Sequence, residues 1–225
     1  MVVYTPGYVP LIQKRYGVPA ERIEVIPAGV DPPSSFGDRG RGEETVLFVG
    51  RLSTQKNLPL LLEALRILVC RGRPATLRIV GEGEEEGLLR RLVSELGLAD
   101  RVILAGRLEG EALAREYRRA SVLALPSERE SFGIVLIEAM SYGTPVVATD
   151  ILGLRDVVDN GVTGLLCAGV PEAFAGALEA VLADPALRER LAAAGLEEAR
   201  RYDWRVIIPR YLALYDQIAG QGRRP

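Results

Sequence analysis

The sequence predicts an α/β protein with a Rossmann-like parallel sheet and helices on both faces. Two observations favour this fold class. From Thr45 to Cys167, short apolar runs alternate with longer segments in which apolar residues recur at helical spacing. Glycine or proline separates most of these segments. Strands that alternate with helices form a parallel sheet, and right-handed crossovers make such a sheet Rossmann-like.

The composition is that of a globular protein of one or two domains. Of the 225 residues, 48% are hydrophobic and 26% are charged, and the formal net charge is −2. We expect no nucleic-acid partner, because there is no basic excess, and no transmembrane segment, because no apolar run reaches ~20 residues. The chain has no histidine, which excludes catalysis by an imidazole. We interpret Cys70 and Cys167 as reduced core thiols of a cytoplasmic protein.

Residues 1–42 are predicted to precede the main domain. The expected elements are a strand at 2–5, a helix around 7–16 that ends at Gly17, and a strand at 23–26. Residues 34–44 are rich in glycine and charge, which is typical of a linker. We therefore place a domain boundary there.

The main domain is expected to span residues 43–202. Its predicted strands lie at 46–49, 76–80, 102–104, 122–125, 145–147 and 163–167. The first helix between them is expected to begin near Asn57. The later helices are expected at 88–96, 111–119 and 134–140, with a short helix at 155–158. Asn57 is predicted to be an N-cap, with Pro59 in the first helical turn. Three helices without intervening strands follow, at 171–183, 185–201 and 204–219.

The stretch 127–147 combines several features of a binding site. A polar turn leads through Phe132 and Gly133 into an apolar helix that contains one acid, Glu138. An apolar helix is normally buried, and a buried carboxylate needs a partner, which this helix does not offer. Gly133 leaves the amides at the helix N-terminus open to an anion. These features favour a ligand with both hydroxyl groups and a phosphate.

Distinctive loops follow the predicted strands and are expected to converge on one crevice, because ligands of open parallel sheets bind at the carboxyl ends of the strands. Arg51 and Lys56 would place two cations near Gly133, which suits a diphosphate. Two cations in a single loop are commonly solvated surface charges, but their combination with the helix start favours the binding interpretation. Gly81 equally fits a tight turn, and Arg107 equally fits a surface salt bridge.

Two glutamates, Glu130 in the loop and Glu138 in the helix, are separated by seven residues. The first is placed to touch a reacting sugar and the second to touch a ribose. Glu130 alone would be interpreted as a surface acid beside Arg129. For Glu138, a salt bridge to a neighbouring helix remains the alternative.

Residues 27–166 resemble the C-terminal, donor-binding half of the retaining GT-B glycosyltransferases of the large group 1 or family 4 type. The segment with the two glutamates matches the E-x7-E signature of that family, and the segment with Arg51 and Lys56 matches its GRL-x3-K loop. The matching segments are PAGVD (27–31), FVGRLSTQKN (48–57), LPSERESFGIVLIEAMSYGTPVVATD (125–150) and NGVTGLL (160–166). The expected fold is therefore one half of a GT-B fold followed by C-terminal helices.

The resemblance implies a hexosyltransferase of the kind found in polysaccharide biosynthesis. It would move a sugar from a UDP-, GDP- or ADP-sugar to an acceptor hydroxyl, with retention at the anomeric carbon. Glu130, Arg51 and Lys56 would be catalytic, with both cations on the diphosphate leaving group. Glu138 would bind the ribose hydroxyls. The other implied donor-binding residues are Gly50, Ser131, Phe132, Gly133, Ile134, Val135, Gly81 and Arg107. No metal and no cofactor are expected besides the nucleotide-sugar substrate.

The family has a second Rossmann-like domain that carries the acceptor site. Residues 1–42 resemble only its end and the linker, and the helix in 203–225 resembles one that packs back onto it. We therefore expect a gene fragment, a shortened chain or one half of a two-chain enzyme, which needs the missing domain or a partner chain for efficient transfer. Self-association through uncovered apolar surfaces is expected. Peripheral contact with the inner membrane face would come from the missing half.

A non-catalytic nucleotide-sugar-binding subunit that needs a partner chain is the alternative. A nucleotide-sugar epimerase is disfavoured, because the E-x7-E segment fits transferases better. The loop at 150–156 departs from the family pattern, with Leu152-Gly153 where a Gly-Gly pair is usual, so the identity of the sugar is open.

Overall fold

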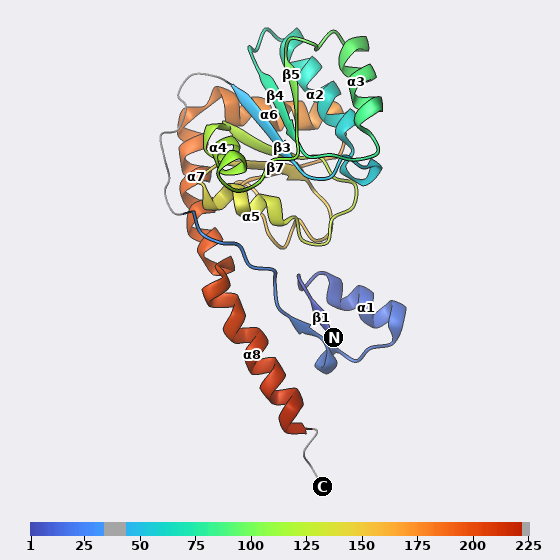
Figure 1. The fold of residues 1–225 in the computed structure, drawn as a ribbon, viewed down its shortest axis with the longest axis vertical. Coiled ribbons are helices and arrows are strands. Elements are labelled where there is room, and N and C mark those ends of the chain that lie inside the picture. Colours follow the sequence, from blue (N-terminus) through green and yellow to red (C-terminus); the bar gives the residue numbers. More distant parts are fainter. Residues whose placement is uncertain (34–43, 222–225) are drawn as a thin grey trace.

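A six-stranded parallel sheet forms the centre of the larger part of the molecule (Figure 1). The structure is a computed structural model that describes residues 1–33 and 44–221. The strands are β3 (Thr45–Val49), β4 (Thr76–Val80), β5 (Val102–Gly106), β6 (Val122–Leu125), β7 (Val146–Thr149) and β8 (Leu165–Cys167). Their order across the sheet is β5-β4-β3-β6-β7-β8, and every pairing is parallel. The predicted fold class is confirmed.

The strand order creates a switch point between β3 and β6. From β3 the chain adds β4 and β5 on one side, and it then crosses to β6 on the other side of β3. At such a point the loops leave neighbouring strands in opposite directions, which opens the crevice where α/β proteins bind their ligands. The loops that leave these two strands carry Lys56 and Glu130.

Helices cover both faces of the sheet. They are α2 (Leu58–Cys70), α3 (Glu86–Glu95), α4 (Gly110–Arg119), α5 (Ile134–Ser141), α6 (Pro171–Ala183) and α7 (Pro185–Ala199). On one face α2 packs against α6, and on the other α5 packs against α7. Every residue of β3, β6 and β7 is buried, as expected for the central strands of a sheet covered on two sides.

The first 33 residues form a small unit with its own two-stranded parallel sheet. It contains β1 (Val2–Val3), α1 (Tyr8–Tyr16), a 3₁₀ turn (Ala20–Arg22) and β2 (Glu24–Val25). The long helix α8 (Trp204–Gln221) extends away from the larger sheet and runs toward this unit (Figure 1). Arg210 and Tyr211 of α8 donate side-chain hydrogen bonds to the carbonyl oxygens of Val25 and Ile26. These bonds tie the two ends of the chain together.

Several local predictions need correction. No helix forms at 155–158, where the chain makes consecutive turns. The reasons are that Gly153 adopts a positive φ of 89° and that the Asp156 side chain accepts a hydrogen bond from the backbone amide of Gly7. The strands at β1 and β2 are shorter than the predicted 2–5 and 23–26. The helix predicted for 185–201 ends at Ala199 and continues as a 3₁₀ turn (Arg200–Tyr202). The predicted boundary at 34–44 lies outside the described residues, except for Glu44.

Asn57 is not an N-cap that bonds through its side chain. It has φ 47° and ψ 47°, in the left-handed region, and its side chain makes no capping hydrogen bond. The reason is that a 3₁₀ turn (Thr54–Lys56) runs directly into α2, so Asn57 has to reverse the backbone between two helical segments. Asparagine tolerates this conformation better than most residues. Pro59 lies in the first turn of α2, as predicted.

The prediction that both cysteines are core thiols is wrong for Cys70. Both thiols are free, but Cys70 is exposed at the end of α2, where the helix surface turns to solvent. Cys167 at the end of β8 is half-buried, and burial raises the pKa of its thiol to about 11. In the described part of the chain, no helix is both long and apolar enough to span a membrane.

Candidate functional site

The loops at the carboxyl edge of the sheet are joined by backbone hydrogen bonds into one continuous rim. The amides that donate across neighbouring loops are Gly50 to Val80 (3.0 Å), Leu52 to Glu82 (2.9 Å), Gly81 to Gly106 (2.8 Å) and Glu128 to Gln55 (2.9 Å). The segments that follow β3, β4, β5 and β6 are therefore held side by side. The convergence expected from the sequence is observed in the backbone.

Gly81 is required by this rim for steric reasons. It has φ 137°, and a Cβ atom at this position would lie 1.9 Å from the carbonyl oxygen of Gly50. A side chain is incompatible with such a close approach of two backbones. The close approach of the two backbones is enough to explain a glycine at position 81. The donor-binding role of Gly50 and Gly81 stays a prediction.

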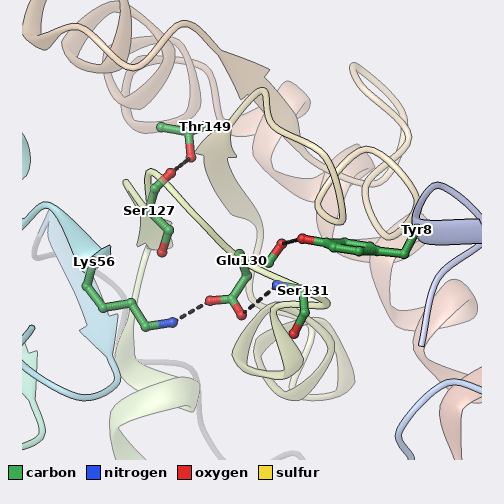
Figure 2. Close-up of polar contacts among 6 residues, drawn as sticks. All are labelled: Tyr8, Lys56, Ser127, Glu130, Ser131 and Thr149. Carbon is green, nitrogen blue, oxygen red and sulfur yellow. Dashed lines mark hydrogen bonds and ion pairs between the residues drawn. The ribbon is translucent and has the colours of Figure 1, made fainter. Parts of the chain in front are cut away.

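Lys56 and Glu130 form an ion pair across the switch point. Lys56 lies at the end of the 3₁₀ turn after β3, and Glu130 lies in the loop after β6 (Figure 2). The lysine Nζ contacts Glu130 Oε2, and the two side chains are only 21% and 15% exposed. Both residues were singled out from the sequence, and the structure brings them into direct contact.

The position of Glu130 is restricted on several sides. Its Oε1 accepts a 3.2 Å hydrogen bond from the amide of Ser131, and its carbonyl oxygen accepts a 3.0 Å bond from the Tyr8 hydroxyl (Figure 2). A Cβ atom on Gly153 would lie 2.4 Å from that same carbonyl oxygen. Burial, with a smaller contribution from Glu130, raises the pKa of Tyr8, so the phenol remains a donor at neutral pH. The Glu130 backbone is therefore fixed from the α1 side and from the loop after β7.

The start of the same loop is anchored to β7. Thr149 donates its hydroxyl hydrogen to the carbonyl oxygen of Ser127 (Figure 2). The Ser127 side chain is fully buried, and its own hydroxyl has no hydrogen-bond partner among the described residues. Together with the contacts to Glu130, this bond leaves the loop few alternative conformations.

The N-terminus of α5 opens beside the ion pair. Gly133 has φ 74°, and a Cβ atom there would lie 2.6 Å from Leu154 Cδ2. The first amides of a helix have no intrahelical acceptor, so they are available to an anion. Ser131 and Ile134 are exposed and Val135 is half-buried. The ring of Phe132 packs in the core against Tyr4 and Tyr202, so only its backbone is available to a ligand.

Glu138 lies further along α5 and is half-buried rather than buried. The expected partner is present, but it is the Tyr117 hydroxyl from α4, which donates a 2.5 Å hydrogen bond to Glu138 Oε2. Among the residues that the structure describes, no lysine or arginine forms the salt bridge to Glu138 that was the alternative. Burial, followed by the negative charge of Glu138, raises the pKa of Tyr117 well above its usual value.

Arg51 and Arg107 are both largely exposed to solvent. Arg51 is 74% exposed and pairs with Glu84 at 3.2 Å, while Arg107 pairs with Glu109 at 2.5 Å. The surface salt bridge considered for Arg107 is observed. Long exposed side chains in such pairs reorient at little cost. Their roles toward a ligand stay predictions.

Three residues of the site were missed in the sequence. Tyr8, Tyr117 and Thr149 contact the glutamate region from distant elements, and nothing in their local sequence indicates those contacts. Tyr117 is the only aromatic residue of α4, which predicts a core position but not a hydrogen bond to a carboxylate. Within residues 1–33 and 44–221, no cluster of three or more acidic, cysteine or histidine side chains is arranged to hold a metal ion.

Comparison with known proteins finds a family model and relatives that match most of this chain. A family model described as "Glycosyl transferases group 1" matches residues 36–198. The phosphatidyl-myo-inositol mannosyltransferase of Mycobacterium leprae (strain TN) is 40% identical over 184 residues, which cover 80% of this chain and 48% of that protein. The D-inositol 3-phosphate glycosyltransferase of Xylanimonas cellulosilytica is 37% identical over 233 residues, covering 93% of this chain and 54% of that protein. The chain thus spans about half the length of these relatives.

Solved structures give the same result for the fold. Sucrose-phosphate synthase from Thermosynechococcus elongatus superimposes with a TM-score of 0.85 at 31% identity, covering 98% of this chain and 58% of that chain. HepE from Anabaena, in complex with UDP and glucose, superimposes with a TM-score of 0.85 at 23% identity, covering 96% of this chain and 62% of that chain. At this lower identity the likeness concerns the fold alone.

Proposed function

Because the chain belongs to the group 1 family of glycosyl transferases, we propose that it is the donor-binding half of a retaining glycosyltransferase. The complete enzyme would move a hexose from a nucleotide-diphosphate sugar to an acceptor hydroxyl. By itself this half binds the donor and transfers the sugar poorly, because the acceptor and several catalytic groups are held by another domain or a partner chain.

The observation that carries the proposal is the shielded Lys56–Glu130 pair at the switch point, beside the N-terminus of α5. A lysine, a carboxylate and free helix amides at one place suit a ligand that has both a sugar and a diphosphate. Glu130 accepts hydrogen bonds from sugar hydroxyls near the anomeric carbon. The amides of Gly133, Ile134 and Val135 bind the diphosphate oxygens.

Transfer places negative charge on the leaving diphosphate. When the bond between the anomeric carbon and the diphosphate oxygen breaks, its electron pair stays on that oxygen. Lys56 and the helix amides stabilise this charge where it develops, which lowers the barrier as well as improving binding. Arg51 leaves its exposed pair with Glu84 and adds a second cation. No metal ion is needed in this proposal, because the cations of the chain supply the charge.

Glu138 binds the ribose of the donor. It lies one helical turn beyond Ile134 on α5, and its side chain is half-buried. A carboxylate accepts hydrogen bonds from two neighbouring hydroxyls, which is the pattern that a ribose presents.

A thermal-shift panel with UDP, GDP, ADP and CMP, and with their common sugar conjugates, tests the proposal. A ligand present at ~100 times its Kd stabilises the folded chain by about 2.7 kcal/mol, which raises the unfolding temperature measurably. We expect a shift with one nucleoside diphosphate that is abolished by Glu138→Ala and weakened strongly by Arg51→Ala.

Arg90→Ala is the matched control for Arg51→Ala. Arg90 also forms an exposed arginine–glutamate pair, with Glu86 on α3, but it lies outside the rim. Its removal should leave the ligand-induced shift unchanged. Absence of a shift with every nucleotide would contradict the proposal, as would an equal loss in the Arg51 and Arg90 variants.

A further inference from the structure

The second glutamate of the site is held by a residue of a different helix. The hydroxyl of Tyr117 in α4 donates to Glu138 Oε2 at 2.5 Å, while the rest of Tyr117 is almost completely buried. A glutamate at a half-exposed helix position normally samples several rotamers. With Oε2 held, the direction of Oε1 is set as well, and no donor among the described residues bonds to Oε1.

Tyr117 is itself held rigidly. Its ring stacks on that of Tyr142, with centroids 5.4 Å apart and an interplanar angle of 11°. Its carbonyl oxygen accepts a 2.6 Å hydrogen bond from the Thr144 hydroxyl. The guanidinium of Arg118 lies 5.9 Å from the Tyr142 ring centroid and pairs with Glu111. The anchor of Glu138 is therefore a packed aromatic pair that joins α4 to the end of α5.

The polarity of the Tyr117–Glu138 bond is unambiguous. A carboxylate has only acceptor positions, so the phenol has to be the donor. Burial raises the pKa of Tyr117 well above 10, and the phenol therefore keeps its proton at neutral pH. The bond is charge-assisted, which makes it stronger than one between neutral groups.

We propose that Tyr117 is a positioning residue that holds the Glu138 carboxylate in the orientation that accepts the ribose hydroxyls of the donor. This inference rests on the proposed function, in which Glu138 contacts the ribose. Binding a ligand through a mobile glutamate costs conformational entropy, and a hydrogen bond formed in advance avoids much of that cost. Precise recognition of the ribose hydroxyls then depends on Tyr117, which holds the Glu138 side chain in place.

The test measures selectivity for the ribose hydroxyls by calorimetric titration. The probes are UDP, GDP and ADP, each compared with its 2′,3′-dideoxy analogue, and the readout is the ratio of the two Kd values. In the unmodified chain we expect the dideoxy form to bind about tenfold or more weakly, as for the loss of hydrogen bonds to a charged group. In Tyr117→Phe the ratio should fall about three- to tenfold, because only binding of the ribose form weakens.

Two further variants separate positioning from packing. Tyr142→Phe removes a hydroxyl from the stacked ring but leaves the Tyr117–Glu138 bond intact, so the ratio should not change. In Glu138→Ala the ratio should approach one, and adding Tyr117→Phe should change it no further, because the two residues act as a unit. Phenylalanine keeps the buried ring, and equal unfolding temperatures would establish that the fold is retained.

The outcomes distinguish the two proposals. No nucleotide binding by the unmodified chain, or a ratio near one, overturns the ribose role of Glu138 and this inference with it. A ratio that is lost in Glu138→Ala but unchanged in Tyr117→Phe overturns the inference alone. An equal decrease in Tyr117→Phe and Tyr142→Phe also overturns it, because the effect would then come from packing.

Discussion

At the scale of single residues, the rim depends on glycines that no other residue replaces. We expect Gly81→Ala to lower the free energy of unfolding by more than about 2 kcal/mol, because the added Cβ would meet a backbone oxygen and φ 137° disfavours alanine. Urea denaturation followed by circular dichroism measures the change. A variant as stable as the unmodified chain would contradict the close backbone approach.

Gly176→Ala is the control for that substitution. Gly176 is exposed within α6, and a Cβ there would meet nothing within 4 Å. Alanine is the better helix former, so this variant should be more stable by about 0.5–1 kcal/mol. The same chemical change thus has opposite signs at the two positions.

The Lys56–Glu130 pair makes a second prediction at this scale. In the free protein Glu130 is paired with Lys56, the cation that the proposed diphosphate would contact. Glu130→Gln should therefore strengthen the binding of a nucleoside diphosphate without its sugar, by about three- to tenfold, whereas Lys56→Ala should weaken it by at least as much. Titration calorimetry with the nucleotide found in the thermal-shift panel measures both. Weaker binding in both variants would mean that the pair acts as one structural unit.

At the scale of secondary-structure elements, the helix starts follow two different rules. Asp184 caps α7 as expected from its type, since its Oδ1 accepts hydrogen bonds from the amides of Ala186 and Leu187 at 2.9 and 3.0 Å. Asn57 precedes α2 in a similar sequence position, but it starts the helix through its left-handed backbone conformation and makes no capping hydrogen bond with its side chain. Neighbouring structure, here the preceding 3₁₀ turn, decides between the two uses.

Substitution of Asn57 tests this difference. Serine is as good an N-cap as asparagine but tolerates the left-handed region poorly, and glycine tolerates it well. We expect Asn57→Ser to lower the free energy of unfolding by about 1 kcal/mol and Asn57→Gly to leave it within a few tenths. Equal stability of the serine variant and the unmodified chain would support a capping side chain instead.

At the scale of the whole molecule, α8 presents a continuous apolar stripe. Ile208, Leu212, Tyr215 and Ile218 recur at helical spacing and are each exposed by 48–60%. Arg210 and Tyr211 of the same helix contact β2 and the residue after it. Exposed apolar surface of this extent favours association with another surface.

We therefore expect the chain to self-associate as its concentration rises. Leu212→Glu should shift the association to concentrations at least about tenfold higher, because a charge would be buried in the contact. Light scattering over a concentration series measures this. Val162→Glu is the control, since Val162 is 49% exposed but lies in the loop before β8. A monomer at all concentrations would contradict the prediction.

Much of this molecule was predictable from its sequence. The alternation of strand and helix is visible in the sequence, because apolar residues recur every two residues in strands and every 3.6 in helices, and both periods involve residues close together in the chain. The same holds for the positions of Gly133, Glu130 and Lys56, since loops at the carboxyl ends of parallel strands must share one edge. The helix expected at 155–158 failed because a glycine and a contact to the N-terminal unit override the local pattern.

The fold class, the edge of the sheet that carries the site and the residue types gathered there follow from local sequence patterns. Which side chains meet follows only from the packing of the folded chain. Lys56 and Glu130 are 74 residues apart, Tyr117 and Glu138 are 21 apart, and Tyr8 and Glu130 are 122 apart. Such contacts depend on how strands are ordered in the sheet and how helices pack over it. Those arrangements arise from the whole core, so no single segment of the sequence encodes them.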